Sequence, residues 1–381
     1  MKVIFLSSDR LILGDSPARR RMAEYGRIFD EVHVIVFAKG VRRKENISAN
    51  VSYYTTGSLS RWRYPFDAFL IAKAIIAKSG SVKGDFIVSA QDPFEAGAIA
   101  YWLKKRTGVP YQIQIHTDFL SPYFVKEHWE NRLRLLTAGF ILERADCIRA
   151  VSQRIVRSLV LRYPAISRER IAVLPVWGEP FSIHPVPEAG RFNILVVSRL
   201  EPEKGIDDAL SAFKMFHALG GSGRLVIVGS GSQYQKLRKR AESQDIAPFV
   251  SFEGWQATLG KYYETADVFL MPSHYEGWGM AAYEAVRIGI PVVITNVGLA
   301  GEAVKDGENG LIVPVGDIEA MAHALLKVSR GELRFSGAVG ADLPPHQKIT
   351  GLRPWCGGLS ATQAEYLEQY LKAMKLCQKP S

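Results

Sequence analysis

One stretch of the chain, residues 267–295, constrains the fold more than any other. An apolar run over 267–272 leads into a loop with two glycines, then a helical pattern over 280–288, then a second apolar run over 291–295. This order predicts a strand, a loop, a helix and a strand, which is the repeating unit of a parallel sheet with helical crossovers. Such a unit brings free backbone N–H groups and a positive helix end to the carboxyl edge of the sheet, where ligands bind.

Two glutamates frame this turn. Glu276 lies in the loop and Glu284 lies in the first turns of the predicted helix, while Gly277 and Gly279 allow a ligand to approach the backbone closely. Taken alone, the pair fits equally well an ordinary strand-to-helix connection with a solvated glutamate at each end.

A second loop of the same kind carries two cations. Arg199 and Lys204 follow an apolar strand at 193–197 and precede a helix at 207–219. Guanidinium and ammonium groups are the side chains best suited to bind a diphosphate. The alternative is a surface ion pair with Glu201 or Glu203, although such pairs contribute little to stability.

A third turn, Gly229-Ser230-Gly231, follows the predicted strand 224–228. It is not a dinucleotide fingerprint, because Tyr234 stands where the third glycine would be.

Together these features resemble the donor half of family 4 glycosyltransferases, which have the GT-B fold. The resemblance covers residues 192–326 and depends on the order and spacing of Arg199, Lys204, Gly229-Ser230-Gly231 and Glu276 to Glu284. It implies an α/β protein with two Rossmann-like, doubly wound parallel-sheet domains facing across a cleft. We expect an acceptor-side domain at 1–180, a linker at 181–190, a donor-nucleotide domain at 191–360 and a terminal helix at 361–381 that returns to the first domain.

The resemblance also implies an activity. It is the transfer of a hexose-type sugar from a UDP- or GDP-linked donor to an acceptor, with retention of anomeric configuration. In this interpretation Glu284 binds the ribose, Glu276 binds the donor sugar, and His116 contacts that sugar from the other domain. The catalytic set is Glu276, His116, Arg199 and Lys204. The donor-binding set is Arg199, Lys204, Gly229, Gly231, Gly277, Trp278, Gly279, Met280 and Glu284.

The first half of the chain repeats the strand and helix alternation. We expect strands at 2–8, 31–37, 51–55, 85–90, 111–115 and 147–151, and helices at 18–29, 66–78, 94–106 and 127–145. His116 ends the strand 111–115, a position that more often holds a packed histidine than a functional one. Gly14 and Asp15 are the acceptor-side candidates, although the family usually has two adjacent glycines where Gly14 stands alone.

No Asp-x-Asp motif, the usual ligand set for a catalytic divalent metal in sugar transfer, occurs in the sequence. Fixed cations and a helix end are the other way to stabilise a leaving diphosphate. We therefore predict transfer without a metal and without any other cofactor.

The net charge of +10 lies entirely in the first half. Residues 1–188 hold 28 Lys and Arg against 18 Asp and Glu, while residues 189–381 hold 20 of each. A basic half-domain attracts anionic surfaces, and we expect a membrane partner, with Trp62 and Tyr64 as interfacial anchors. A solvated basic face without a partner is the alternative, and no nucleic-acid motif accompanies the charge.

The sequence predicts a cytoplasmic protein, peripheral on the inner face of the membrane. No run of 18 apolar residues occurs, and the first apolar run is too short for a secretory signal. Three scattered cysteines, Cys147, Cys356 and Cys377, argue for a reducing compartment and against a metal knot. The expected acceptor is a sugar, a lipid-linked sugar or a polysaccharide of the cell envelope.

Two other functions stay open on the sequence. A GT-B sugar-nucleotide epimerase would release nucleotide and altered sugar without an acceptor, and a non-catalytic nucleotide-sugar scaffold on a membrane would tolerate the loss of Glu276. The glycine- and proline-rich segment 331–360 departs from the helical pattern that the family usually has there, which a loop insertion or a reading-frame error would explain.

Overall fold

The computed structural model describes residues 1–78, 85–178, 192–332 and 362–378, which form two compact units. Unit 1 comprises Met1–Leu120, Val125–Trp177 and Gly357–Ser381, and unit 2 comprises Ser121–Phe124 and Gly178–Cys356. The predicted linker 181–190 and residues 333–360 of the glycine- and proline-rich segment lie outside the described residues.

Unit 1 is built on an eight-stranded sheet with the order β3-β4-β2-β1-β5-β6-β7-β8. All neighbouring strands are parallel except β3, which is antiparallel to β4. The strands are β1 (Lys2–Ser7), β2 (Glu31–Val36), β3 (Lys44–Ser48), β4 (Val51–Thr55), β5 (Phe86–Ala90), β6 (Tyr111–Ile115), β7 (Cys147–Ala150) and β8 (Ile171–Val173). Strands β3 and β8 were not predicted, because β3 is a polar edge strand without hydrophobic alternation and β8 has only three residues.

Three helices of unit 1, α1, α6 and α12, begin at a polar N-cap side chain. Ser16 accepts a hydrogen bond from the Arg19 N–H at the start of α1, and Ser152 caps α6, a helix that the sequence analysis missed. The predicted helix 127–145 corresponds to α5 (Trp129–Glu143), and the short helix α4 (Pro122–Glu127) before it was not predicted. The helices are α1 (Pro17–Tyr25), α2 (Tyr64–Lys78), α3 (Glu95–Thr107), α5 (Trp129–Glu143), α6 (Gln153–Arg162) and α12 (Gln363–Lys375), while the short helix α4 has its first residues in unit 2.

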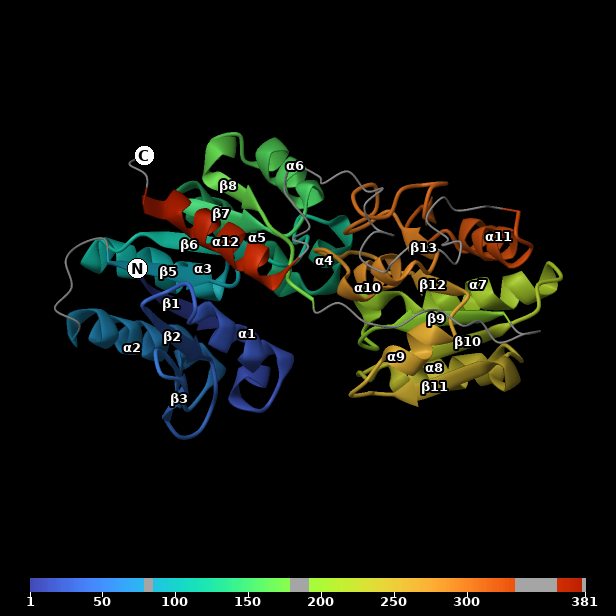
Figure 1. Cartoon of the computed structure of the whole chain (residues 1–381), viewed down its shortest axis with the longest axis horizontal. Helices are drawn as coiled ribbons and strands as arrows, with labels where there is room; N and C mark the ends of the chain where they lie inside the picture. The colour runs from blue at the N-terminus through green and yellow to red at the C-terminus, as the bar shows by residue number, and fades with distance from the viewer. Residues whose placement is uncertain (79–84, 179–191, 333–361, 379–381) are drawn as a thin grey trace. The chain divides into compact units, whose positions relative to one another are not determined.

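Helix α12 is the C-terminal helix, and it packs within unit 1 against β7 and α1 (Figure 1). Thr362 and Glu365 form a capping box at its start, and Tyr370 stacks on Tyr25 with 4.4 Å between ring centroids. Just beyond the helix, Cys377 forms a disulfide with Cys147 of β7. The scatter of these cysteines along the sequence gave no sign of this bond, so the cysteines no longer support a reducing compartment.

Unit 2 is built on a six-stranded, fully parallel sheet with the order β11-β10-β9-β12-β13-β14. The strands are β9 (Asn193–Val197), β10 (Arg224–Val228), β11 (Val250–Gly254), β12 (Val268–Met271), β13 (Val292–Thr295) and β14 (Gly310–Val313). The helices are α7 (Ile206–Ala218), α8 (Tyr234–Ser243), α9 (Gly260–Glu264), α10 (Met280–Ile288) and α11 (Ile318–Ser329). Helices α9 and α11 and strand β14 were not predicted from the sequence.

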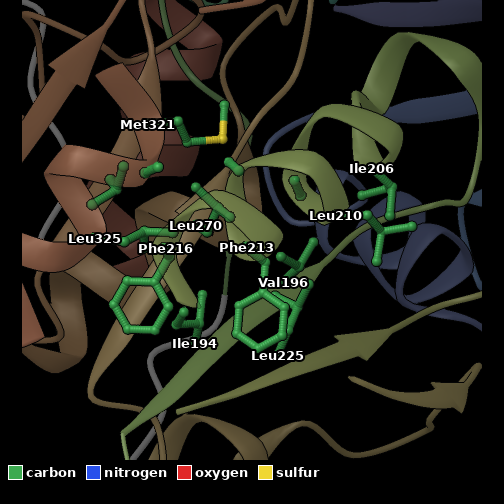
Figure 2. Packing of buried hydrophobic residues seen from close by; sticks show 14 of the residues in the cluster. Ile194, Val196, Ile206, Leu210, Phe213, Phe216, Leu225, Leu270, Met321 and Leu325 are labelled. Carbon is green, nitrogen blue, oxygen red and sulfur yellow. The ribbon is translucent and has the colours of Figure 1, made fainter. Parts of the chain in front are cut away.

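The core of unit 2 explains why these segments form a sheet covered by helices. Phe213 and Phe216 of α7 pack against the β9 side chains Ile194 and Val196, and Met321 of α11 belongs to the same buried cluster (Figure 2). Because both faces of a parallel sheet are covered, its strands are continuously apolar, as the strand β9 is.

Short 3-10 turns connect several of these elements. They are η1 (Arg10–Leu13), η2 (Arg61–Arg63), η3 (Arg168–Arg170), η4 (Pro202–Lys204), η5 (Ala247–Phe249) and η6 (Leu376–Gln378). Both units are α/β structures with mostly parallel sheets, which confirms the predicted fold class. Among the described helices, none has the length and apolar character needed to cross a membrane.

Candidate active site

The candidate site lies at the carboxyl edge of the unit 2 sheet. The strand order reverses between β9 and β12, which are neighbours, and such a switch point is where open α/β sheets bind ligands. The loop after β9 carries Lys204 and the loop after β12 carries Glu276. Lys204 Nζ donates a hydrogen bond to Glu276 Oε1 at 2.7 Å, although the two residues are 72 positions apart in sequence.

Glu276 is held in a defined orientation. Ser273 Oγ also donates to Oε1, at 3.0 Å, and the Lys204 and Glu276 side chains are only 14% and 15% exposed. Within the described parts of the chain, Oε2 has no hydrogen-bond partner. The carboxylate therefore offers one oriented oxygen to a ligand hydroxyl. Sequence analysis did not identify Ser273, because a lone serine three residues before a glutamate carries no distinct signal.

Helix α10 begins directly beside this cluster. Gly279 is its N-cap residue, with φ of +99°, and no side chain among the described residues caps the helix. A Cβ at this position would also lie about 3 Å from Leu299 and Met271, so both the backbone conformation and the packing require glycine. The N–H groups of the first turn, beginning at Met280, have no acceptor within the helix and present a partial positive charge.

Glu284 lies one turn into α10 and is partly buried. Its Oε2 accepts a hydrogen bond from the Tyr263 hydroxyl at 2.8 Å. Burial raises the pKa of Glu284, while the bond from Tyr263 and the charge of Arg287 act in the opposite direction. Tyr263 is a further residue that the sequence analysis missed, because it lies in the separate helix α9.

The buried Trp278 side chain packs edge-on against Tyr283. The loop around Trp278 is supported by the turn after β13, where Leu299 N donates to the Trp278 carbonyl at 2.8 Å. Its neighbour Gly277 is also buried. Trp278 thus contributes a packed side chain to the loop, in addition to its backbone.

Arg199 forms an ion pair with Glu203, which was the alternative to a diphosphate-binding role. Its guanidinium donates to Glu203 at 2.8 Å, with the Arg199 side chain largely exposed. Lys204 does not pair with Glu201 or Glu203 and instead binds Glu276. Glu201 accepts bonds from the backbone N–H and the hydroxyl of Ser232, which ties the β9 loop to the β10 loop.

Gly229 and Gly231 form the turn after β10. A Cβ at Gly229 would lie 1.8 Å from the Ser198 carbonyl oxygen, and the φ of Gly229 is +140°. A Cβ at Gly231 would lie 2.4 Å from the Leu200 carbonyl oxygen. Both glycines are thus required by the close approach of two loops, whatever ligand lies beside them.

His274 anchors the β12 loop to α7. Its Nε2 lies 2.8 Å from Asp208 Oδ2 of α7, and its ring stacks on Tyr123 with 5.2 Å between centroids. Tyr123 belongs to the short segment Ser121–Phe124 that packs on unit 2. Such a contact cannot be read from sequence, because it joins residues about 150 positions apart.

His116 belongs to unit 1 and is oriented by a hydrogen-bond network. Gln114 Nε2 donates to Ser89 Oγ at 2.7 Å and to the Tyr370 hydroxyl at 2.9 Å, while its Oε1 accepts from Arg149 at 2.7 Å. Arginine only donates, which fixes the orientation of this amide. His116 Nε2, 3.1 Å from the same Oε1, is therefore the protonated nitrogen, and Nδ1 carries the lone pair.

The same surroundings keep His116 neutral. Burial lowers the pKa of His116 to about 3, and the positive charges of Arg149 and Arg21 add to the effect. Arg149 is itself fully buried, where it also donates to the carbonyls of Leu174 and Pro175 and to the Tyr366 hydroxyl. The imidazole thus presents a hydrogen-bond acceptor at neutral pH.

The acceptor-side candidates Gly14 and Asp15 lie in the loop after η1. Gly14 has an extended backbone, and a Cβ there would meet no described atom within 4 Å. Asp15 is exposed and pairs with Arg20 at 3.0 Å. Neither residue has a structural constraint that explains its identity.

Unit 2 thus brings together Lys204, Glu276 and the start of α10, whereas His116, Gly14 and Asp15 belong to unit 1. Over residues 1–78, 85–178, 192–332 and 362–378, there is no group of three or more His, Cys, Asp or Glu side chains that could hold a metal ion.

Two family models match the chain. The model described as "Glycosyl transferases group 1" matches residues 181–335, and the "Glycosyl transferase 4-like domain" model matches residues 31–177. The curated relatives match only in part. Mycobacterium tuberculosis glycogen synthase is 34% identical over 183 residues, which cover 48% of this chain and 44% of the relative.

A second relative from Mycobacterium tuberculosis is the GDP-mannose-dependent alpha-(1-6)-phosphatidylinositol monomannoside mannosyltransferase. It is 34% identical over 163 residues, which cover 40% of this chain and 42% of the relative. The matched segments thus span less than half the length of either relative.

Similar solved structures cover nearly the whole chain. Sucrose-phosphate synthase from Thermosynechococcus elongatus superposes with a TM-score of 0.75 and 21% identity over 98% of this chain and 99% of its own. The lipopolysaccharide outer core galactosyltransferase WaaB gives 0.72 and 18% over the same shares. The two parallel-sheet units and the similarity to these structures assign the chain to the GT-B class of glycosyltransferase folds. With both family models matched, the chain belongs to the group 1 glycosyltransferases of family 4.

Proposed function

We propose that this protein transfers a hexose-type sugar from a nucleotide-diphosphate donor to an acceptor hydroxyl, with retention of configuration and without a metal ion. The observation that carries the proposal is the cluster of Lys204, Glu276 and Ser273 beside the uncapped start of α10, at the switch point of the sheet. The cluster places a cation, an oriented carboxylate oxygen and free N–H groups within one pair of adjacent loops.

The leaving diphosphate is the group that most needs stabilisation. As the bond between the anomeric carbon and the phosphate oxygen breaks, negative charge grows on the diphosphate, and fixed positive groups lower the energy of that state. The N–H groups of α10 and the Lys204 ammonium supply this charge. Lys204 has three donors, so it can bind a phosphate oxygen while keeping Glu276 in place. Arg199, whose side chain is 70% exposed, can turn from Glu203 toward a phosphate oxygen.

The sugar is held by hydrogen bonds on the other side of the breaking bond. Glu276 Oε2 accepts a hydrogen bond from a sugar hydroxyl. The negative charge of the Glu276 carboxylate stabilises the positive charge that develops at the anomeric carbon. The acceptor oxygen attacks the same face that the diphosphate leaves, and its proton passes to the departing phosphate oxygen. No protein base is needed, which agrees with the hydrogen bonds that already occupy Glu276 Oε1.

The remaining candidate residues bind rather than react. Glu284 accepts hydrogen bonds from the ribose hydroxyls of a UDP or GDP donor. The Gly229–Gly231 turn lies beside the nucleotide. His116, which belongs to the acceptor-side domain at 1–180, accepts a hydrogen bond from a donor-sugar hydroxyl through Nδ1. Gly14 and Asp15 border the acceptor.

We further propose a cell-envelope acceptor, such as a glycolipid or a polysaccharide repeat, and a peripheral position on the cytoplasmic face of the membrane. Two of the similar proteins act on such molecules by name, the phosphatidylinositol monomannoside mannosyltransferase and the lipopolysaccharide outer core galactosyltransferase. The positive charge confined to residues 1–188 supports an anionic surface as a partner.

The test is donor hydrolysis without an acceptor, measured for a panel of UDP- and GDP-sugars with and without EDTA. Wild type should hydrolyse one donor slowly and equally well with chelator. Glu276→Gln should reduce this rate by about 10²- to 10³-fold, as for other groups that stabilise charge in a transition state. Glu242→Gln, an exposed substitution on α8, is the matched control and should leave the rate unchanged.

Other outcomes would assign a different function. Release of free nucleotide together with an altered sugar would indicate an epimerase. Tight donor binding with no turnover, unaffected by Glu276→Gln, would indicate a binding scaffold. Hydrolysis that EDTA abolishes would refute the metal-independent mechanism.

A further inference from the structure

Helix α5 exposes an apolar stripe where a surface helix would normally be polar. Trp129, Leu133, Leu136 and Phe140 are 71%, 54%, 75% and 46% exposed. They are spaced by four, three and four residues, so their side chains share one face of the helix. The opposite face, with Ala138 and Leu142, is buried against unit 1. The inner face already packs α5 onto the unit, so the exposure of Trp129, Leu133 and Leu136 is not explained by packing within the unit.

The stripe continues onto the neighbouring helix α3. Tyr101 of α3 packs edge-on against Phe140 with 5.2 Å between ring centroids, and against Trp102 at 5.8 Å. Trp102 is itself more than half exposed. The apolar surface therefore spans two adjacent helices, which soluble monomers rarely expose without a binding partner. We call Trp102 and the α5 stripe together the α3–α5 surface.

Basic side chains border the α3–α5 surface and contact its rings. The Arg144 guanidinium lies 3.7 Å from the Phe140 ring centroid, and Lys105 Nζ lies 5.8 Å from that of Tyr101. Arg106 and Arg132 are also exposed on these helices. The acidic neighbours are the exposed Glu130, the half-buried Glu143, whose Oε2 lies 3.9 Å from Arg144, and Glu95 of α3, which pairs with Arg134 of α5 at 2.8 Å. Cations therefore predominate around the apolar stripe.

This combination is complementary to an anionic bilayer surface. Apolar and indole side chains insert at the boundary between head groups and acyl chains, while arginine and lysine remain at the level of the lipid phosphates. Of the two anchors predicted from sequence, Trp62 is exposed, whereas Tyr64 accepts a hydrogen bond from Arg10 and stacks on Phe37. Trp62 stays a predicted anchor, and the α3–α5 surface is a second feature that was not predicted from sequence.

We propose that the α3–α5 surface docks on an anionic lipid bilayer, with the α5 stripe in the interfacial layer. The proposal gives the membrane partner a defined binding face. It does not depend on sugar transfer, because docking involves no nucleotide sugar and can be measured without one.

The experiment is flotation of the full-length protein with vesicles of phosphatidylcholine alone or with 30% phosphatidylglycerol. Wild type should bind the mixed vesicles, and binding should weaken as salt is raised. Leu133→Ser/Leu136→Ser should lower the partition coefficient at least about tenfold, since each leucine loses apolar contact with lipid. Arg132→Gln/Arg144→Gln should lower it by about tenfold or more, since each cation near an anionic surface contributes about fivefold.

Phe249→Ser replaces a partly exposed apolar side chain of unit 2 and is the matched control, which should bind as wild type does. Circular dichroism confirms that each variant is folded. Equal binding to both vesicle types, or unchanged binding by Leu133→Ser/Leu136→Ser, would overturn the proposal. A wild-type dimer that this double variant converts to a monomer, without vesicle binding, would instead make the surface a contact between copies and would also overturn it.

Discussion

Replacing His116 with glutamine should make the stability of the protein less sensitive to acid. In the folded chain the pKa of His116 is lowered to about 3, whereas an unfolded histidine titrates near 6.5. Between these values the unfolded state binds the proton and the folded state does not. The contribution of the neutral imidazole is therefore complete above pH 6.5 and is lost progressively as the pH falls toward 3.

The expected magnitude follows from this window. A pH of 5 is about 1.5 units below the pKa of histidine in the unfolded chain, and each unit corresponds to about 1.4 kcal/mol. About 2 kcal/mol of unfolding free energy is therefore lost between pH 8 and pH 5. In His116→Gln this loss is absent. The glutamine amide can still donate to Gln114 Oε1, which is the bond that His116 Nε2 makes.

The assay is urea unfolding of wild type and His116→Gln at pH 8 and pH 5. The loss of unfolding free energy between the two pH values should be about 2 kcal/mol larger in wild type. The exposed His128→Gln provides the matched control. In ¹⁵N spectra at pH 5, His116 should be neutral with the proton on Nε2. A His116 resonance that titrates near pH 6.5, or a protonated Nδ1, would refute the network assigned to Gln114 and Arg149.

Three further predictions concern other parts of the chain. Glu284→Ala should weaken UDP or GDP binding at least about tenfold by calorimetry, since hydrogen bonds to a charged group are lost. Because burial raises the pKa of Glu284, wild-type binding should decline with acid at a higher pH than an ordinary glutamate would give, and the variant should lack this decline. Cys147→Ala should lower the unfolding free energy by about 3–5 kcal/mol, because the disulfide closes a separation of 230 residues. Thiol titration of the unreduced, denatured wild type should find one free cysteine of three; finding three would contradict the bond. Gly229→Ala should destabilise unit 2 by about 2 kcal/mol or more in thermal unfolding, whereas Gly14→Ala should have little effect; equal effects would contradict the packing assigned to the turn.

The sequence alone predicted the local units of the fold. Strands such as β9 and β12 are short apolar runs ending in loops, and α10 is bounded by Gly279 and Gly289. These signals are local, because a buried parallel strand must be continuously apolar and a helix must begin and end at residues that tolerate its termini. The same reasoning failed for β3 and β8, whose pairing is decided by neighbouring strands rather than by their own residues.

The candidate site was predicted as a set of residue types, not as an arrangement. The sequence indicated Arg199, Lys204, Glu276 and Glu284, because their order and spacing resemble a known family. It did not indicate that Lys204 binds Glu276 while Arg199 pairs with Glu203. Each cation had several carboxylates within reach along the chain, and only the positions of the two loops at the switch point decide which pair forms.

What only the tertiary structure decided was long-range. The Cys147–Cys377 bond joins the last helical segment to the strand β7. The network from Tyr370 through Gln114 to His116 fixes one tautomer of an imidazole that is distant in sequence from α12. The apolar stripe of α5 was not identified from the sequence, which predicted only a helix over 127–145. Periodicity tells which residues share a face of a helix, but packing alone tells which face is covered and which is left to solvent.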